Sequence, residues 1–309
     1  MRVLVTGGAG FIGSHLAADL VGRGDTVRIF DAAAADPRGN LAAIGSHVEF
    51  LHGDLRDDAA VGRAVEGIEV VYHMAADASV PRSVADPRTC YDVNVTGTLN
   101  LLEAARKAGC RRVVFASSSA VYGDDPVLPK RESMPPRPGS PYASSKLAGE
   151  DLCAVFWRSY GLESVALRFF NVYGPRQDPN GAYAPVIPRF IAALRRGETP
   201  TVFGDGEQTR DFVYVADVVR ALRLGAATPD AAGGVFNVAS GQAVTLSRLV
   251  ALLFDALGAE VRIRHEPERP GDVRHSAADT SAIRAALGWE ADVSLDAGLS
   301  QTIASEPGE

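Results

Sequence analysis

The sequence predicts an α/β fold with a doubly wound parallel sheet. Short apolar runs such as 3–6, 70–73 and 113–116 are typical of strands buried on both faces. Segments with helical periodicity follow them, as in 12–21 and 87–108. Regular alternation of the two kinds of segment predicts parallel strands joined by helices that cover both faces of the sheet.

Length, charge and cysteine content limit the class of protein. The 309 residues are enough for one large α/β unit or two packed subdomains. The net charge of −7 and the lack of a basic stripe argue against a nucleic-acid partner. No run of 18 apolar residues and no secretory pattern is present, so we expect no membrane partner and a cytoplasmic location. The cysteines Cys90, Cys110 and Cys153 are far apart and odd in number, which indicates reduced thiols and no metal site.

A glycine-rich turn lies between the first strand and the first helix, with Gly7, Gly10 and Gly13 in a repeated spacing. In this context the glycines permit close approach of a pyrophosphate to backbone N–H groups at a helix N-terminus, although a plain tight turn is the alternative. Asp31 ends the second strand, 18 residues after Gly13. An acid there binds the adenosine ribose and repels a 2′-phosphate, which predicts NAD rather than NADP, unless Asp31 only caps a helix or loop.

Other strand ends contribute to the same edge of the sheet, where ligands of such folds bind. Asp54 follows the strand 48–51 and either contacts the adenine or caps the next helix. His73 ends a strand and is expected to be packed rather than catalytic. Met74-Ala75-Ala76 comes next, and its two small alanines leave room for a ligand. The strand 113–116 ends in Ser117-Ser118-Ser119.

Tyr142 and Lys146 form the most informative pair. They lie four residues apart at the start of a predicted helix, which places both on one face. An ammonium beside a phenol favours the phenolate, so we expect Tyr142 to act as a base well below its ordinary pKa of about 10. The chain has only three lysines, at positions 107, 130 and 146, and uses arginine elsewhere. Because lysine is so rare in this chain, its presence here weighs against the alternative that Tyr142 and Lys146 are unrelated surface residues.

Further motifs extend the pattern over the whole chain, at 6–13, 53–55, 73–76, 117–123, 142–146, 168–180, 204–212 and 269–272. With them the chain resembles an extended short-chain dehydrogenase/reductase, and within that family the nucleotide-sugar 4-epimerases. The resemblance implies a Rossmann-type NAD-binding domain over 1–168 and a smaller carboxyl-terminal α/β substrate-binding domain over 169–309, with the segment around 212–240 returning to the first domain. It also implies a homodimer packed through the helices near 86–108 and 141–160.

The resemblance assigns the reaction to Ser118, Tyr142 and Lys146. Tyr142 would be the general base at the sugar 4-hydroxyl, Ser118 would hydrogen-bond that hydroxyl, and Lys146 would be the electrostatic partner of Tyr142 and a ligand of the nicotinamide ribose. Hydride leaves C4 for NAD and returns to the other face of a transient 4-keto sugar, so net redox is zero.

Two sets of binding residues follow from the same resemblance. The cofactor set is Gly7, Gly10, Phe11, Ile12, Gly13, Asp31, Asp54, Leu55, Met74, Ala75, Ala76, Asn94, Ser117, Tyr142 and Lys146. The UDP-sugar set is Ser79, Ser118, Asn171, Gln177, Val186, Phe203, Arg210, Arg269, Asp272 and Ser276. Arg210 and Arg269 are suited to clamp the two phosphates because guanidinium binds phosphate in a bidentate manner. Asn171 would also hold the diphosphate, Phe203 the uracil and Asp272 the uridine ribose.

Related reactions stay open. Sugar 4,6-dehydratases carry Asp-Glu where this chain has Ser119 and Ala120, and Ala120 cannot do acid–base work. Glucuronate epimerases and decarboxylases need a group for a C6 carboxylate, for which Arg176 is available, but Asp178 is unfavourable there. A non-catalytic NAD-binding sensor would have lost the tyrosine and lysine. Because Ser276 is small, N-acetylated UDP-hexoses are expected to be accepted as well as plain ones.

Overall fold

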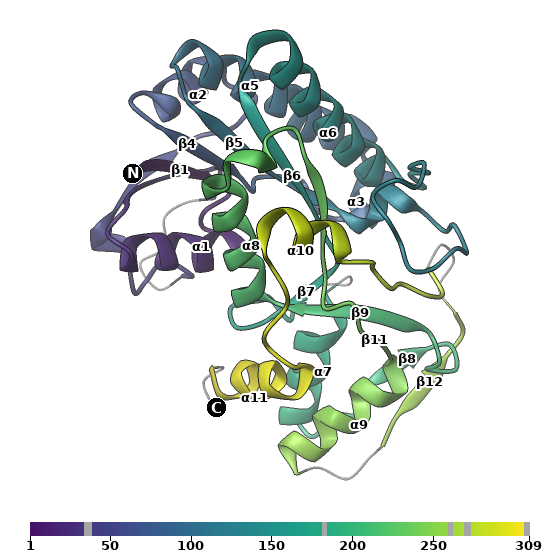
Figure 1. The fold of residues 1–309 in the computed structure, drawn as a ribbon. Helices are drawn as coiled ribbons and strands as arrows, with labels where there is room; N and C mark the ends of the chain where they lie inside the picture. The colour runs from purple at the N-terminus through teal and green to yellow at the C-terminus, as the bar shows by residue number, and fades with distance from the viewer. Residues whose placement is uncertain (34–38, 181–183, 259–261, 269–272, 306–309) are drawn as a thin grey trace.

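The computed structural model describes residues 1–33, 39–180, 184–258, 262–268 and 273–305. A seven-stranded sheet, entirely parallel, forms its centre in the order β10-β6-β5-β4-β1-β2-β3. The strands are β1 (Arg2–Thr6), β2 (Thr26–Asp31), β3 (Val48–His52), β4 (Val70–His73), β5 (Arg112–Ser118), β6 (Glu163–Phe169) and β10 (Val235–Val238). The predicted doubly wound α/β fold is confirmed (Figure 1).

Helices cover both faces of this sheet (Figure 1). They are α1 (Phe11–Gly22) and α8 (Val215–Ala227) on one face, and α2 (Asp58–Val65), α5 (Gly97–Lys107) and α6 (Pro141–Tyr160) on the other. Val3 and Val5 pack in the core between the sheet and the helices α1 and α8. Leu4 packs in the core on the other face, between the sheet and α2, α5 and α6. Since alternate residues of a strand face opposite sides, two covered faces require the uninterrupted apolar run seen in the sequence.

The helix expected over 87–108 is present but not uniform. It begins as α4 (Pro87–Tyr91), widens into a π-helical segment at Asp92–Thr96, and continues as α5. A short helix, α3 (Val80–Ala85), precedes it. The π-helical segment contains Asn94, the polar residue that interrupts the apolar pattern, and segments of this kind are frequent at functional sites.

The remaining elements form a smaller unit below the sheet in Figure 1. One sheet joins β7 (Asn171–Tyr173), β9 (Thr209–Tyr214) and β11 (Ala243–Thr245), and another joins β8 (Thr201–Phe203) to β12 (Arg264–Glu266). The helices α7 (Val186–Arg195), α9 (Leu246–Leu257) and α11 (Leu295–Ser305) enclose a separate core that includes Phe190, Leu249 and Leu299.

Part of the carboxyl-terminal sequence returns to the large sheet. The strand β10 pairs with β6, and α8 packs on the sheet beside α1. The helix α10 (Ser281–Leu287) packs on α8 and β10, and three short 3-10 turns lie at Gly45–His47, Ser119–Tyr122 and Pro229–Ala231. Within the described ranges, no helix is both long enough and apolar enough to cross a membrane.

Candidate active site

A cavity of about 520 Å³ opens where the carboxyl ends of β1, β2, β4 and β5 meet the start of α6. All of the predicted cofactor residues except Asn94 line it: Gly7, Gly10, Phe11, Ile12, Gly13, Asp31, Asp54, Leu55, Met74, Ala75, Ala76, Ser117, Tyr142 and Lys146. A volume of this size is typical of a small-molecule or cofactor site.

The glycine-rich turn shapes one end of the cavity. Gly7 has a φ of 66°, a left-handed conformation that favours glycine, and its carbonyl accepts a bond from the N–H of Gly10 at 3.1 Å. A Cβ at Gly13 would overlap the carbonyl oxygen of Gly7, so α1 could not pack this closely against the turn with any other residue. The N-terminus of α1 has no side-chain cap and no acid in its first turn. Its first N–H groups have no acceptor within the helix and suit a bound phosphate.

Asp31 stands at the other side of the turn. Its carboxylate accepts backbone N–H groups from Ala9 and Ala33, both at 2.9 Å, and neither residue belongs to a helix. Asp31 therefore does not cap a helix, but its bond to the N–H of Ala33, two residues on, is that of a loop cap, so this alternative stays open. A carboxylate has about four acceptor positions, so Asp31 retains capacity for the ribose hydroxyl groups of NAD. Two groups at the cavity, the N-terminus of α1 and the carboxylate of Asp31, fit a dinucleotide that has no 2′-phosphate.

Asp54 is not a helix cap. Asp57 begins α2 instead, where its Oδ1 accepts the N–H of Ala60 at 3.0 Å. Asp54 lines the cavity and forms an ion pair with Arg56 at 2.6 Å, and the Arg56 hydrogen bond lowers the pKa of Asp54. The adenine contact of Asp54 stays a prediction.

Two of the three predicted catalytic residues, Tyr142 and Lys146, line the cavity, and Ser118 lies beside Tyr142. Tyr142 is the second residue of α6, and Lys146 follows one turn later. The Lys146 Nζ donates to the carbonyl of Ala116 at 2.8 Å and lies 5.9 Å from the centre of the Tyr142 ring. Ser118 ends β5, and its side chain hydrogen-bonds that of Tyr142. The geometry therefore places a phenol, a hydroxyl and an ammonium together.

The expected pKa of Tyr142 is wrong for the described chain. Burial raises the pKa of the phenol, and the hydrogen bond with Ser118 only partly opposes that rise. Burial also lowers the pKa of Lys146 to about 8, although Cys90 and Glu150 oppose the change. Desolvation penalises both charged forms, and it exceeds the attraction that the spacing of the two residues suggests.

A buried ion pair beneath Lys146 is a feature that the sequence reasoning missed. Glu150 and Arg168 are paired at 2.7 Å with side chains that are only 5% exposed. Glu150 also accepts a hydrogen bond from Ser117, which lines the cavity. The sequence spacing could have revealed Glu150, because it lies four residues after Lys146 and therefore on the same helical face.

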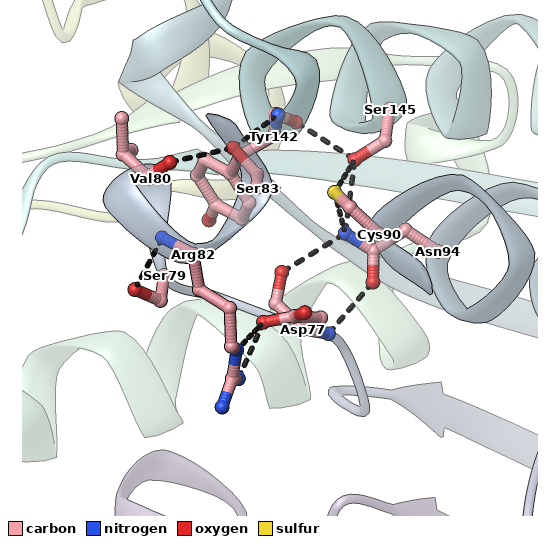
Figure 2. A network of polar contacts seen from close by, with 9 residues as sticks. All are labelled: Asp77, Ser79, Val80, Arg82, Ser83, Cys90, Asn94, Tyr142 and Ser145. Carbon is pink, nitrogen blue, oxygen red and sulfur yellow. Dashed lines mark hydrogen bonds and ion pairs between the residues drawn. The ribbon is translucent and has the colours of Figure 1, made fainter. Parts of the chain in front are cut away.

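Asn94 does not line the cavity, and Figure 2 shows it among Asp77, Cys90 and Ser145. Its Oδ1 accepts the N–H of Asp77 at 2.7 Å, and its Nδ2 donates to the carbonyl of Asp77 at 3.0 Å and to Ser145 Oγ at 2.9 Å. Both amide hydrogens thus go to protein acceptors. A cofactor contact of Asn94 stays a prediction, and what the structure assigns to it is the fixing of Asp77.

His73 is packed, as expected. Its ring nitrogens hydrogen-bond Thr6 Oγ1 at 2.8 Å and Thr98 Oγ1 at 2.9 Å, and its exposed fraction is 1%. Burial, helped by the charge of Lys146, lowers its pKa to about 3. A neutral imidazole with both nitrogens occupied has no free group for catalysis.

A second cavity, of about 320 Å³, lies in the smaller unit. Five of the predicted substrate residues line it: Asn171, Gln177, Val186, Phe203 and Arg210. Arg189, which the sequence reasoning missed, also lines it, with its guanidinium 5.8 Å from the centre of the Phe203 ring. Two arginines and an aromatic ring suit a nucleoside diphosphate.

The other predicted substrate residues lie elsewhere. Ser79 caps α3 by accepting the N–H of Arg82, and Ser118 belongs to the catalytic group described above. The N–H of Ser276 donates to the carbonyl of Thr209 at 3.1 Å, and Ser276 lines neither cavity. Arg269 and Asp272 fall outside the described residues.

The fold and this site together define a dinucleotide-dependent enzyme of the short-chain dehydrogenase/reductase type. The chain belongs to the NAD dependent epimerase/dehydratase family, whose model matches residues 3–239. NAD is the cofactor of that family, and the residues at the larger cavity fit it.

Several known proteins are similar over nearly the whole chain. A UDP-glucose 4-epimerase of Mycolicibacterium smegmatis is 42% identical over 307 residues, which cover 98% of this chain and 97% of the relative. A solved UDP-N-acetylglucosamine 4-epimerase of Methanobrevibacter ruminantium has a TM-score of 0.93 and 40% identity, with 98% and 97% of the chains covered. A dTDP-glucose 4,6-dehydratase of Streptomyces griseus is 37% identical, covering 98% and 92%.

Proposed function

We propose that the protein inverts the configuration at C4 of a UDP-hexose through a transient 4-keto sugar. The grouping of Ser118 with Tyr142 and Lys146, of which the last two line the larger cavity, carries the proposal. Similarity to 4-epimerases over nearly the full length supports it. Because the hydride removed from C4 would be returned to C4, such a reaction would consume no cofactor.

Each residue of the trio has a distinct role. Tyr142 removes the proton of the 4-hydroxyl and returns one to the carbonyl oxygen, while Ser118 holds that oxygen by a hydrogen bond. Lys146 is fixed by the carbonyl of Ala116 and favours the phenolate when it is protonated. When bound, NAD supplies the hydride acceptor and, in its oxidised form, a positive charge.

The main competing reaction is sugar 4,6-dehydration, because a dehydratase is among the similar proteins. Elimination across C5 and C6 needs an acid and a base near those carbons. At the place where dehydratases carry Asp-Glu, this chain has Ser119 and Ala120, in the 3-10 turn that directly follows Ser118. The absence of a carboxylate at these two positions favours epimerisation.

The choice of sugar depends on two further residues. Arg176 is the candidate partner of a C6 carboxylate, but its guanidinium hydrogen-bonds Ser14 Oγ of α1 at 3.4 Å. That contact favours neutral hexoses over glucuronate. Ser276 lines neither cavity of the structure, but it has a small side chain and by the family pattern would belong to the wall of the sugar pocket. We therefore expect turnover of UDP-N-acetylglucosamine as well as UDP-glucose.

The decisive experiment is incubation of the purified protein with each UDP-sugar, without added cofactor. We expect the 4-epimer of UDP-glucose and of UDP-N-acetylglucosamine, detected by NMR, and a kcat at least about 100-fold lower for Tyr142→Phe. NAD binding without turnover of either sugar would favour the sensor hypothesis, and a fully active Tyr142→Phe enzyme would refute the proposed base.

The matched specificity variant is Ser276→Tyr. A bulky ring at this position should abolish turnover of the N-acetylated sugar while UDP-glucose turnover persists. Equal loss for both sugars would point to misfolding, which the melting temperature reports. Unchanged turnover of both would remove Ser276 from the sugar pocket.

We also infer a homodimer. The helices α3 to α6 carry large apolar side chains that remain exposed, among them Val84, Tyr91, Leu99, Val155 and Tyr160. Burial of such side chains in a second copy is favourable. Family resemblance supports a second copy of the chain as the partner.

A further inference from the structure

We propose that Ser83 is a positioning residue of the reaction, because its hydroxyl links the segment Asp77–Ser83 to the backbone of Tyr142. The inference rests on the proposed role of Tyr142 as the base. Ser83 lies in α3, it is fully buried, and neither cavity includes it in its lining. No cofactor or substrate role was predicted for it from the sequence.

The Ser83 hydroxyl makes two hydrogen bonds, one within α3 and one to the start of α6 (Figure 2). Its Oγ accepts the N–H of Tyr142 at 3.1 Å and donates to the carbonyl of Val80 at 2.7 Å. Val80 follows Ser79, a predicted substrate residue at the start of α3. The same hydroxyl thus contacts the catalytic helix and the segment that carries Ser79.

The N–H of Tyr142 needs this external partner. The first N–H groups of a helix have no acceptor in the helix itself. Pro141 has no N–H, and the N–H groups of Ala143 and Ser144 bond to Ser140, the N-cap. Ser83 therefore supplies the acceptor for Tyr142, and without it a buried donor would be left unsatisfied at the catalytic residue.

A second link holds the other side of the Tyr142 backbone. Ser145 Oγ donates to the carbonyl of Tyr142 at 2.8 Å and accepts a bond from Asn94 Nδ2 at 2.9 Å. Asn94 in turn holds both backbone groups of Asp77. The segment Asp77–Ser83 is thus connected to Tyr142 at both of its ends, through Asn94 and Ser145 at one and through Ser83 at the other (Figure 2).

This closed set of bonds fixes the separation between the phenol and the 77–83 segment. Asp77 also pairs with Arg82, so the segment is braced internally. Catalytic geometry is sensitive to displacement, since a shift of about 1 Å can cost about 100-fold in rate. Loss of the Ser83 bond frees the first turn of α6, which carries Tyr142, but leaves the glycine-rich turn and Asp31 intact.

Ser83→Ala provides the test and Ser164→Ala provides the matched control. Ser164 is also a buried serine from another element that bonds to the backbone of α6, donating to the carbonyl of Cys153 at 2.9 Å. Cys153 lies about three helical turns from Tyr142. Both variants lose a buried hydrogen bond to the same helix, so we expect similar falls in melting temperature.

The two variants should differ in catalysis. With UDP-glucose, we expect kcat of Ser83→Ala to fall about tenfold or more, with a smaller change in KM and with unchanged NAD content per folded chain. Ser164→Ala should keep the wild-type kcat. A kcat of Ser83→Ala equal to that of Ser164→Ala would overturn the proposal.

Tyr142→Phe, assayed in parallel, tests the role of Tyr142 as the base separately from the positioning role of Ser83. If it retains activity, the proposed base is wrong and the role of Ser83 fails with it. If it is inactive while Ser83→Ala matches Ser164→Ala, only the positioning role fails. Should Ser83→Ala not fold, Ser83→Cys, which has a similar volume and a weaker acceptor, decides the same comparison by the same kcat difference.

Discussion

His73 illustrates how burial, at the scale of one residue, sets charge in this protein. The imidazole lies between Thr6 and Thr98 at the end of β4, and Lys146 adds a like charge to the cost of protonation. Its pKa falls from 6.5 to about 3. The folded chain therefore keeps this histidine neutral over a pH range in which the unfolded chain protonates it.

We expect this difference to make folding sensitive to acid. The pKa of His73 is lower in the folded chain than in the unfolded chain. Its contribution to the free energy of unfolding is therefore fully present above pH 6.5 and is lost as the pH falls from 6.5 toward 3. Between pH 7 and pH 5 the loss from His73 is about 2 kcal/mol. Urea unfolding measures the free energy of unfolding at pH 7 and at pH 5. The difference between the two values should be smaller for His73→Leu than for the wild type, although the variant is less stable at pH 7.

The control for this prediction is His47→Leu, at an exposed position. It should leave the difference between the two pH values as in the wild type. An equal pH difference in wild type and His73→Leu would contradict the assignment of the effect to His73.

Residue roles differ in how far the sequence reveals them. The cavity lining was predictable because the carboxyl ends of parallel strands meet at one edge, which places Gly7, Asp31 and Ser117 together. The pKa of Tyr142 was not, since it depends on how much water the fold removes from the phenol. Ser83 was equally hidden, because its partner is 59 residues away in the chain.

At the scale of elements, α6 is pressed closely against β5. Gly149 allows this approach, because a Cβ there would overlap the ring of Phe115, a side chain that is 2% exposed. The same ring lies 5.1 Å from the Lys146 Nζ. The distance between helix and strand thus also sets where the ammonium lies.

Gly149→Ala should therefore destabilise the protein although alanine favours helices. Overpacking against Phe115 costs about 1–3 kcal/mol, which exceeds the gain of up to about 1 kcal/mol from helix propensity. Urea unfolding measures the change, and kcat should fall because Lys146 moves. Gly62→Ala in α2 is the control: a Cβ there meets nothing within 4 Å, so this variant should be equally or more stable. A stabilised Gly149→Ala protein would contradict the close packing.

Some elements could not be predicted from sequence pattern. The run 87–108 has helical periodicity throughout, which gives no sign of the π-helical segment at Asp92–Thr96. Within that segment Asn94 bonds to Asp77 and Ser145, which are distant in sequence. The three-residue strands β7, β8, β11 and β12 are too short for a period to be recognised, and they exist through their pairing with neighbours.

At the scale of the whole molecule, the large sheet and its two helical layers were predictable, since alternation of strands and helices leaves few topologies. How molecules associate depends on surface that the fold leaves uncovered. The helices α3, α4, α5 and α6 pack together, and among the described helices they carry the exposed large apolar residues. Side chains such as Val155, 43% exposed, and Leu99, 37% exposed, gain from burial in a second copy.

The double variant Leu99→Glu/Val155→Glu should be monomeric. Two like charges in each copy would meet across a symmetric interface that offers them no partner, and burying unpaired charges is costly. Light scattering after gel filtration should give twice the mass of the 32.5 kDa chain for the wild type and a single mass for the variant. Val127→Glu is the control, because Val127 is 59% exposed but lies in the loop between Tyr122 and α6. A monomeric wild type, or a double variant that stays dimeric, would show that these helices do not form the interface.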